Sequence, residues 1–293
     1  MNSGYAYRFD VPPEAAGISL ATYLATRFPH TSVTVWRERI DAGRVTIDGH
    51  LSTGDAPLHT GQAVVWSRPP WVEPETPLHY RVLLEDADLL FVDKPAGLPT
   101  LPGGGYLEHT LQWLVRRDFP DAAPAHRLGR WTSGIVVFGR TTEARRSLSA
   151  QFAGGSLRKR YRALASGNPR WRRRRIAVPI GPVPYPPLGK LHAANWRGRP
   201  SRSDVFVVRR RGDVFVCDVV IATGRPHQIR IHLAAAGHPL LGDPLYVTGG
   251  VPGPRPGLPG EGGYRLHAHR LVLDHPATGA RLALECGLPP GLR

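Results

Sequence analysis

A continuous apolar run at residues 135–138, Ile-Val-Val-Phe, restricts the fold of this chain more than any other feature. β-Branched and aromatic residues over the length of one strand indicate a strand that is covered on both faces. The segment before it, residues 126–134, is polar and contains two glycines, which predicts a loop. Loops at the edge of a buried strand often carry binding and catalytic groups. We therefore expect the functional site to lie where this loop enters the strand.

The charge of the chain points to a polyanionic partner. The 293 residues include 38 Lys and Arg against 23 Asp and Glu, which gives a formal net charge of +15. Clustered arginine gains free energy when it neutralises phosphates, so nucleic acid is the first candidate partner. An anionic membrane surface is the alternative, but no long basic amphipathic helix is visible in the sequence.

Cysteine use and hydropathy set further expectations. Cys217 and Cys286 both lie in apolar surroundings, which predicts buried thiols and neither a disulfide framework nor a metal site. Residues 1–13 lack the basic and apolar regions of a signal peptide, and no window reaches the ~18 apolar residues of a membrane span. We expect a soluble, cytoplasmic protein that acts as a monomer and does not bind a membrane.

The spacing of apolar residues predicts two domains. Residues 1–66 are expected to form a small module with helices at 18–28 and 36–42 and strands at 44–49 and 64–66. Residues 67–79 contain four prolines and predict a semi-rigid linker at a domain boundary. Residues 80–293 form the main domain.

Residues 40–49, Ile-Asp-Ala-Gly-Arg-Val-Thr-Ile-Asp-Gly, carry a motif of their own. They resemble the Ile-x-x-Gly-x-Val-x-x-(Asn/Asp)-Gly motif of the S-four-like RNA-binding module of ribosomal proteins. The resemblance implies that Arg37, Arg39 and Arg44 contact RNA. A purely structural N-terminal cap is the alternative.

In the main domain the patterns indicate a mixture of helices and strands. Ile229, Arg230 and Ile231 alternate as on a strand, which places Arg230 and His232 on one face. Residues 181–200, with five prolines, predict an irregular insertion. The other expected elements are strands at 82–84, 89–92, 204–208 and 214–221, helices at 110–117 and 142–152, and a loop at 249–263.

Basic residues are concentrated in one segment of the main domain. Residues 158–175 contain nine Lys and Arg, no acidic residue, and Trp171. A basic run with an aromatic residue suits contact with an RNA backbone and stacking on a base. A solvated arm is the alternative for residues 172–175.

Four motifs in order resemble those of the RluA-type RNA pseudouridine synthases, and the resemblance covers about residues 80–285. Residues 126–134, His-Arg-Leu-Gly-Arg-Trp-Thr-Ser-Gly, are similar to the family's His-Arg-Leu-Asp-x-x-Thr-Ser-Gly. The other matching segments are residues 86–97, residues 223–246 with the sequence His-Gln-Ile-Arg-Ile-His-Leu, and residues 266–279. The resemblance implies an α+β fold with a mixed, mainly antiparallel sheet and a central cleft. It also implies a strand at 157–165, similar to the family's Lys-x-Tyr-x-Ala strand, and a closing strand at 266–271.

The resemblance also implies an activity: the isomerisation of uridine to pseudouridine in ribosomal or transfer RNA. It implies no metal, no nucleotide and no other cofactor, and the target base must leave the helical stack to react. Tyr161 is expected to stack on the uracil and to serve in proton transfer, and Arg230 to pair with the catalytic carboxylate. The expected RNA contacts of this domain are His126, Arg127, Arg225 and His227, and a structural hydrogen-bonding role is the alternative for all four.

One position departs from the family motif. Gly129 stands where the family has its catalytic aspartate, and no acidic residue lies between Asp121 and Glu143. Asp93 and Asp243 match positions that the family uses structurally. Two hypotheses follow: an active synthase that uses another acid or a substrate-assisted route, and a catalytically silent RNA-binding protein on the same fold.

Overall fold

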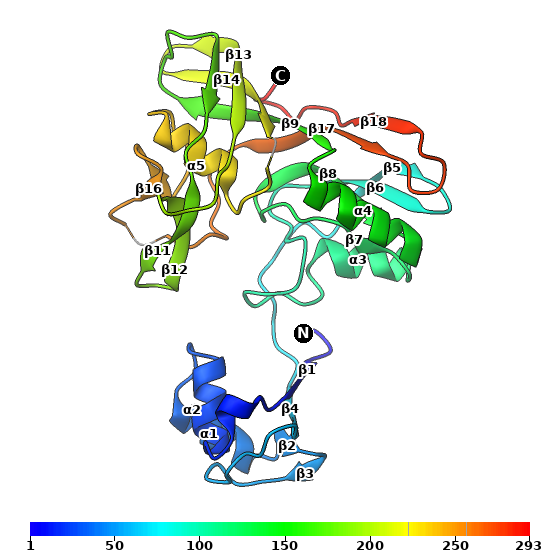
Figure 1. Cartoon of the computed structure of the whole chain (residues 1–293), viewed down its shortest axis with the longest axis vertical. Coiled ribbons are helices and arrows are strands. Elements are labelled where there is room, and N and C mark those ends of the chain that lie inside the picture. The colour runs from blue at the N-terminus through cyan, green and yellow to red at the C-terminus, as the bar shows by residue number, and fades with distance from the viewer. Residues whose placement is uncertain (222, 256) are drawn as a thin grey trace. The chain divides into compact units, whose positions relative to one another are not determined.

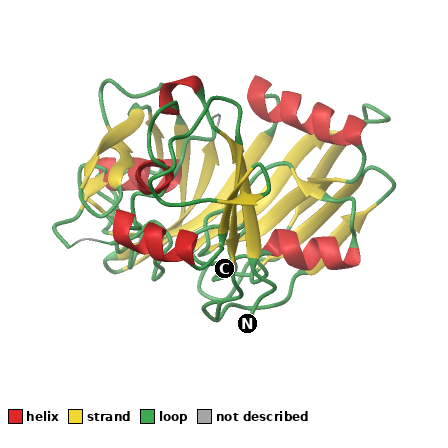
Figure 2. Ribbon diagram, turned by 90° about the horizontal axis from the view of Figure 1, so that it is seen from below, coloured by secondary structure: helices red, strands yellow, loops and turns green. Residues whose placement is uncertain are grey.

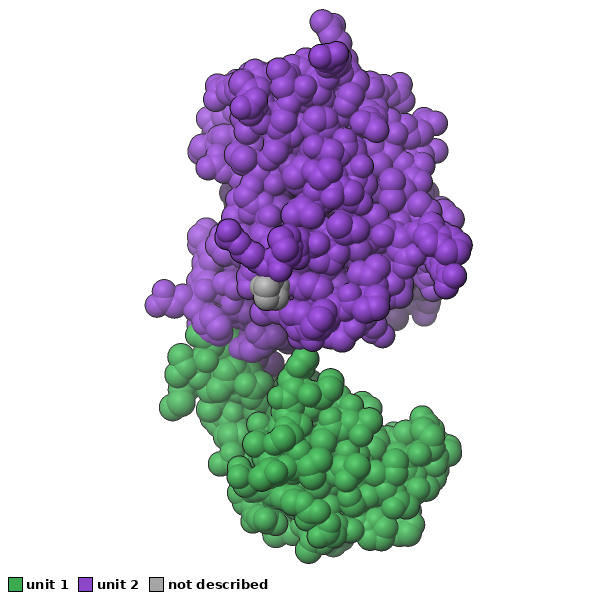
Figure 3. Space-filling model, turned by 90° about the vertical axis from the view of Figure 1, so that its left-hand side faces the viewer, with its two compact units in different colours: residues 1–73 green, residues 74–293 purple. Residues whose placement is uncertain are grey.

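The computed structural model describes residues 1–221, 223–255 and 257–293. The chain divides into two compact units, residues 1–73 (unit 1) and 74–293 (unit 2), which Figure 3 shows in separate colours. The division falls inside the proline-rich segment 67–79. However, the last strand of unit 1 continues to Arg68, so its residues 67 and 68 are not linker. No helix among the described residues is both long and apolar enough to cross a membrane.

Unit 1 packs two helices on a sheet with strand order β1-β4-β2-β3. Its core is aromatic, with the rings of Trp36 and Trp66 4.8 Å apart in an edge-to-face arrangement. Both predicted helices are present, and the β1 strand was not predicted. The elements are β1 (Tyr5–Asp10), the short 3₁₀ helix η1 (Pro13–Ala15), α1 (Leu20–Arg27), α2 (Val33–Asp41), β2 (Val45–Ile47), β3 (His50–Leu51) and β4 (Ala63–Arg68).

Unit 2 is built on a long mixed sheet, seen as the yellow strands of Figure 2. The strand order is β10-β13-β14-β9-β17-β8-β6-β5, with β18 beside β17 and β7 beside β8. Among the pairs that the structure describes in this sheet, only β17 with β8 is parallel. This confirms the expected mixed, mainly antiparallel sheet.

The order of elements along unit 2 can be followed by colour in Figure 1. They are β5 (Arg81–Glu85), β6 (Leu89–Lys94), α3 (Leu111–Asp118), β7 (Ala123–Pro124), β8 (Thr132–Gly139), α4 (Thr142–Gly154), β9 (Arg158–Ser166), β10 (Arg173–Ile176), β11 (Ile180–Tyr185), β12 (Gly189–Ala194), β13 (Ser203–Arg211), β14 (Val214–Ile221), α5 (Gln228–Ala235), β15 (Tyr246–Val247), β16 (Val251–Pro252), β17 (Leu266–Asp274) and β18 (Arg281–Glu285).

The apolar run is a buried strand, as predicted. Residues 134–139 of β8 are all buried, between β6 and β17 in the sheet. Both cysteines are buried free thiols, also as predicted. The two predicted helices of unit 2 begin at threonine caps, where Thr110 accepts from the Trp113 backbone N–H at 3.3 Å and Thr141 from Ala144 at 3.1 Å.

Two predictions for unit 2 were wrong. Arg230 lies on helix α5 and not on a strand, so it shares no face with His232, which is buried against Ser201 and Ser203. Nearly every side chain of α5 is buried, so the helix has no polar face and its apolar residues mimic strand alternation.

Residues 181–200 contain the hairpin β11–β12 instead of an irregular insertion. Within the predicted loop 249–263, residues 251 and 252 pair as β16, and Pro256 lies outside the described residues.

A buried lysine at the end of strand β6 joins two loops. Lys94 is fully buried, and its ammonium donates to the carbonyls of Pro95 (2.9 Å), Leu98 (2.6 Å) and Arg130 (3.0 Å). Burial lowers the pKa of Lys94 to about 7, although all three ammonium protons have acceptors. Thr100 adds a second link, because its hydroxyl donates to the Leu128 carbonyl at 2.9 Å. Loop 95–100 therefore fixes loop 126–131.

Replacing Lys94 by methionine is expected to lower the free energy of unfolding of unit 2 by about 3 kcal/mol or more. The variant leaves one buried and two partly buried carbonyls without their donor, and each costs roughly 1–3 kcal/mol. Urea unfolding monitored by tryptophan fluorescence measures the change. Lys190→Met, at an exposed position of β12, is the matched control and should change the value by less than about 0.5 kcal/mol. Equal effects of the two substitutions would refute the role of Lys94.

Candidate active site

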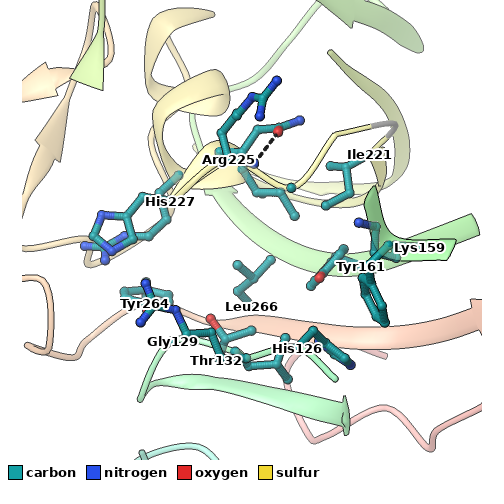
Figure 4. Close-up of a pocket in the computed structure, with 17 residues that line it drawn as sticks. His126, Gly129, Thr132, Lys159, Tyr161, Ile221, Arg225, His227, Tyr264 and Leu266 are labelled. Atoms are coloured by element: carbon teal, nitrogen blue, oxygen red, sulfur yellow. Dashed lines mark hydrogen bonds between the residues drawn. The ribbon is translucent and has the colours of Figure 1, made fainter. Parts of the chain in front are cut away.

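A cavity of about 250 Å³ lies in unit 2 between loop 126–132, strand β9 and the start of helix α5. Figure 4 shows Arg225 and His227 on one side of it and Gly129, Thr132 and His126 on the other. Pockets for drug-sized ligands enclose about 300–1,000 Å³, so this one suits a smaller group such as one nucleobase. The lining residues are His126, Arg127, Leu128, Gly129, Thr132, Phe152, Lys159, Tyr161, Ile221, Gly224, Arg225, His227, Gln228, Ile229, Arg230, Tyr264 and Leu266.

Strand β9 contributes Lys159 and Tyr161, which its two-residue period places on the cavity face. Burial raises the pKa of Tyr161 to about 12, so the phenol stays protonated at neutral pH. In Figure 4 its hydroxyl points into the cavity. Tyr161 is therefore a flat apolar ring with a proton donor at its tip.

His126 supports the cavity wall. Its ring stacks on Phe152 with centroids 4.8 Å apart, and its Nε2 accepts from the Val137 backbone N–H at 3.2 Å. Burial, and then the charge of Lys159, lowers the pKa of His126 to about 3. The imidazole is thus neutral, with its proton on Nδ1, and it ties the loop to strand β8.

Arg230 has a carboxylate partner, but from a different segment than expected. Its guanidinium binds Asp243 at 2.7 and 2.8 Å, and the two side chains are only 3% and 1% exposed. The rings of Tyr264 and Tyr246 lie 4.4 and 5.1 Å from the guanidinium carbon. Asp243 also accepts the backbone N–H groups of residues 245 and 246. Both of its oxygens are occupied, so Asp243 does not replace an acid in the cavity.

Gly129 occupies a position that other residues can adopt. Its φ lies outside the left-handed region, and a Cβ atom there would meet Tyr264 Oη at 3.4 Å and Thr132 Oγ1 at 3.6 Å, ordinary contacts. The backbone therefore does not require glycine. The hydroxyls of Tyr264 and Thr132 therefore lie next to the position of a Cβ atom at residue 129.

The cavity is cationic. Arg127, Lys159, Arg225 and Arg230 line it, and none of the described lining residues is Asp or Glu. Asp93 is elsewhere, on β6, paired with Arg81 at 3.0 Å. The described part of the cavity thus suits anionic groups and offers no carboxylate.

His227 offers a hydrogen-bond acceptor. The Tyr246 hydroxyl donates to the His192 carbonyl at 2.6 Å, so at 2.7 Å it must accept the proton of His227 Nδ1. Burial, and then the charge of Arg230, lowers the pKa of His227 to about 3. Nε2 is therefore unprotonated.

Gln228 fixes the loop before α5. Its Oε1 accepts the Thr223 hydroxyl at 2.7 Å and the Arg225 backbone N–H at 3.1 Å, the latter drawn as a dashed line in Figure 4. Among the described residues, the Arg225 guanidinium makes two long contacts, of 3.4 Å each, both to the Pro200 carbonyl. This leaves most of its donors for a ligand.

The structure gathers seven predicted residues of unit 2 around one cavity: His126, Arg127, Gly129, Tyr161, Arg225, His227 and Arg230. Their roles in RNA binding and catalysis stay predictions. Arg37, Arg39 and Arg44 belong to unit 1, where Arg37 pairs with Asp55 at 2.9 Å and Arg39 lies 4.7 Å from the Trp36 ring.

Sequence reasoning missed several lining residues. Lys159 had a usable signal, since it lies two positions before Tyr161 on a predicted strand. Phe152 and Tyr264 had none, because they come from the end of α4 and from a long loop that only the tertiary fold brings to the cavity.

One cluster outside the cavity has side chains of the metal-binding types. Ligand atoms of Asp86, Asp88 and His275 lie within 4.8 Å of one another. Each is held by the protein: Asp86 accepts from the Leu89 backbone N–H at 2.8 Å and contacts His275 at 3.2 Å, and Asp88 accepts the Thr141 hydroxyl at 3.0 Å. These bonds explain the cluster as the support of the β5–β6 turn.

Comparison with known proteins identifies the family of this chain. Residues 88–235 match the model of the RNA pseudouridylate synthase family. The chain is 42% identical to a Synechocystis sp. protein named as an RNA pseudouridine synthase, over 92% of this chain and 94% of the relative. This chain belongs to the RNA pseudouridylate synthase family. It is therefore an RNA-modifying isomerase by family, and the four motifs of the sequence identified it correctly.

Two further proteins named as pseudouridine synthases are similar to this chain. It is 30% identical to the ribosomal large subunit pseudouridine synthase D of Pseudomonas aeruginosa, over 96% of this chain and 91% of that one. The solved structure of human RNA pseudouridylate synthase domain containing 1 matches with a TM-score of 0.60 and 26% identity, covering 76% of this chain and 89% of the human one. The family thus accounts for the pseudouridine-synthase-like fold of unit 2.

Three neutral histidines, one buried and two partly buried, make the synthase sensitive to acid. Burial lowers the pKa of His126 and His227 to about 3 and that of His267 to about 4. The unfolded chain takes up these protons near pH 6.5 and the folded chain does not, so stability is full above pH 6.5 and falls as the pH drops towards 4. Each histidine contributes up to about 1.4 kcal/mol per pH unit.

Urea unfolding at pH 6.5, 5.5 and 4.5 measures this loss. His126→Gln should reduce the pH slope by roughly one proton, whereas His79→Gln, at an exposed position of unit 2, should leave it unchanged. An unchanged slope in His126→Gln would show that His126 is protonated in the folded state.

Proposed function

We propose that this cavity receives a uridine extruded from ribosomal RNA and isomerises it to pseudouridine. The observation that carries the proposal is the convergence of Tyr161, Arg230 and the Gly129 loop on one cation-lined cavity of base size. The relative named for the ribosomal large subunit supports ribosomal RNA as the substrate.

The chemistry needs no added atom. The bond from uracil N1 to the ribose C1′ breaks, the base turns, a bond forms from C5 to C1′, and the proton lost from C5 is balanced by one gained at N1. Negative charge on the departing base is stabilised by the nearby cations Arg127, Lys159 and Arg225. The Tyr161 ring supports the base by stacking, and its hydroxyl exchanges a proton near C5.

A second candidate function is RNA binding without turnover. One observation favours it: no carboxylate lines the described part of the cavity, and Gly129 stands where the family motif has aspartate. For the first function, the substrate's own groups or a water molecule must take the place of that acid.

Mapping pseudouridine in a large-subunit ribosomal RNA transcript decides between the two. We expect the purified protein to form pseudouridine at specific uridines, and Tyr161→Phe to slow this at least about 100-fold while the affinity for the transcript stays within twofold. No pseudouridine above a control without protein, with binding intact, would establish the silent alternative.

Gly129→Asp tests whether the cavity is otherwise complete. The backbone accepts a side chain here, and Tyr264 and Thr132 are placed to donate to a carboxylate, so we expect pseudouridine formation to rise about 100-fold or more. Gly129→Asn has nearly the same shape without the charge and is the matched control. Equal rates for the two variants would refute a role for a carboxylate at this position.

We further propose that unit 1 is an S-four-like RNA-binding module. Burial, and then the charges of Arg68 and Arg44, lowers the pKa of Arg39, so these three arginines form one positive cluster. Arg39→Gln combined with Arg44→Gln should weaken binding of the transcript several-fold without changing the rate at saturating RNA. Unchanged affinity would leave unit 1 as a structural cap.

A further inference from the structure

The unit 2 sheet carries a second basic surface on the face away from the cavity. Strand β9 points Lys159 and Tyr161 to the cavity, so its alternate residues Arg160 and Arg162 face the other way. Strand pairing extends this face in two rows, because residues directly opposite on antiparallel strands share a face.

The two rows cross several strands. One runs through Arg175, Asp204, Val220, Arg160 and Arg270. The other runs through Arg173, Phe206, Asp218 and Arg162. Arg202 joins them at the start of β13, 3.7 Å from Asp204. We call the six arginines, Arg160, Arg162, Arg173, Arg175, Arg202 and Arg270, the arginine strip.

The carboxylates on this face do not balance the positive charge of the arginine strip. Asp204 alone is shared by Arg173, Arg175 and Arg202, at 3.7, 3.0 and 3.7 Å. Asp218 is shared by Arg160 and Arg162, at 4.0 and 2.6 Å, and Glu285 pairs with Arg270 at 3.1 Å. Six arginines against three carboxylates leave an excess of three positive charges.

The arrangement fits the backbone of RNA. The acids orient the guanidiniums, yet the side chains of Arg160, Arg173, Arg175, Arg202 and Arg270 stay 39–62% exposed. From β10 to β17 the strip crosses four strand spacings, about 19 Å, which is long enough to contact several phosphates of one RNA strand. Guanidinium forks match phosphate oxygens, and the guanidinium carbon of Arg173 lies 5.1 Å from the centre of the half-buried Phe206 ring within the strip.

We propose that the arginine strip is a second RNA-binding surface, which holds the phosphate backbone of a segment remote from the nucleotide in the cavity. The inference rests on the RNA partner of the proposed function but not on turnover. Because strip and cavity lie on opposite faces of one sheet, a single RNA reaches both only by passing around the sheet. The surface therefore favours long, structured RNA over short oligonucleotides.

Binding of poly(A) to the full chain tests the strip, since this polymer contains no uridine for the cavity. The variant Arg173→Gln, Arg175→Gln, Arg202→Gln should bind at least tenfold more weakly at 0.1 M salt. Its slope of log affinity against log salt should fall by about two, from three lost phosphate contacts at ~0.7 each. The triple lysine variant at the same positions should keep the wild-type slope.

The matched control removes three exposed arginines from helices α3 and α4: Arg116→Gln, Arg117→Gln, Arg146→Gln. It should bind poly(A) within twofold of wild type. Equal losses in both glutamine variants, or wild-type affinity in the strip variant, would overturn the inference. So would a strip variant that loses binding to phosphatidylglycerol vesicles but keeps poly(A), because the surface would then serve a membrane.

Two further results keep the outcomes separate. Should the strip variant unfold in a thermal melt, Arg160→Gln with Arg270→Gln at the other end of the strip takes its place, with a tenfold loss still expected. If no pseudouridine forms in the ribosomal transcript but the poly(A) results are as expected, the proposed function is wrong and the proposal that the arginine strip binds RNA still holds.

Discussion

The ammonium of Lys94 holds together the two loops on which the cavity depends. Its three carbonyl acceptors belong to loop 95–98 and to Arg130, next to Gly129. A fully buried cation is costly unless every donor is satisfied, so the contacts are mutually dependent. Lys94 ends strand β6, and loop 126–131 leads into the adjacent strand β8. The pairing of these two strands therefore fixes the position of the loop that lines the cavity.

A second buried charge completes the opposite wall. Arg230 is neutralised by Asp243 and enclosed by two tyrosine rings, so helix α5 presents a fixed guanidinium without help from residue 129. This explains how the cavity keeps its form around a glycine. The carboxylate of Asp243 thus has a structural role at this wall, and no described residue that lines the cavity supplies another carboxylate.

Sequence reasoning worked best where one residue type has one physical meaning. The apolar run of β8 and the helical spacing of apolar residues in α1 are local signals, and each predicted its element. It failed at α5, because a helix buried on all sides loses its polar face. It also failed at residues 181–200, where prolines suggested irregular chain but Pro182 and Pro184 lie within a two-stranded hairpin that is not joined to the main sheet.

The sequence by itself determined the family, the buried strand and the positive charge, because these depend on residue identity and short spacing. Only the tertiary structure decided that Asp243 forms the ion pair with Arg230 and that Phe152 and Tyr264 line the cavity. It also decided that the six arginines of the arginine strip share one face of the sheet. The physical reason is that strand pairing and burial join residues far apart in the chain, and single-sequence periodicity carries no information about which strands become neighbours.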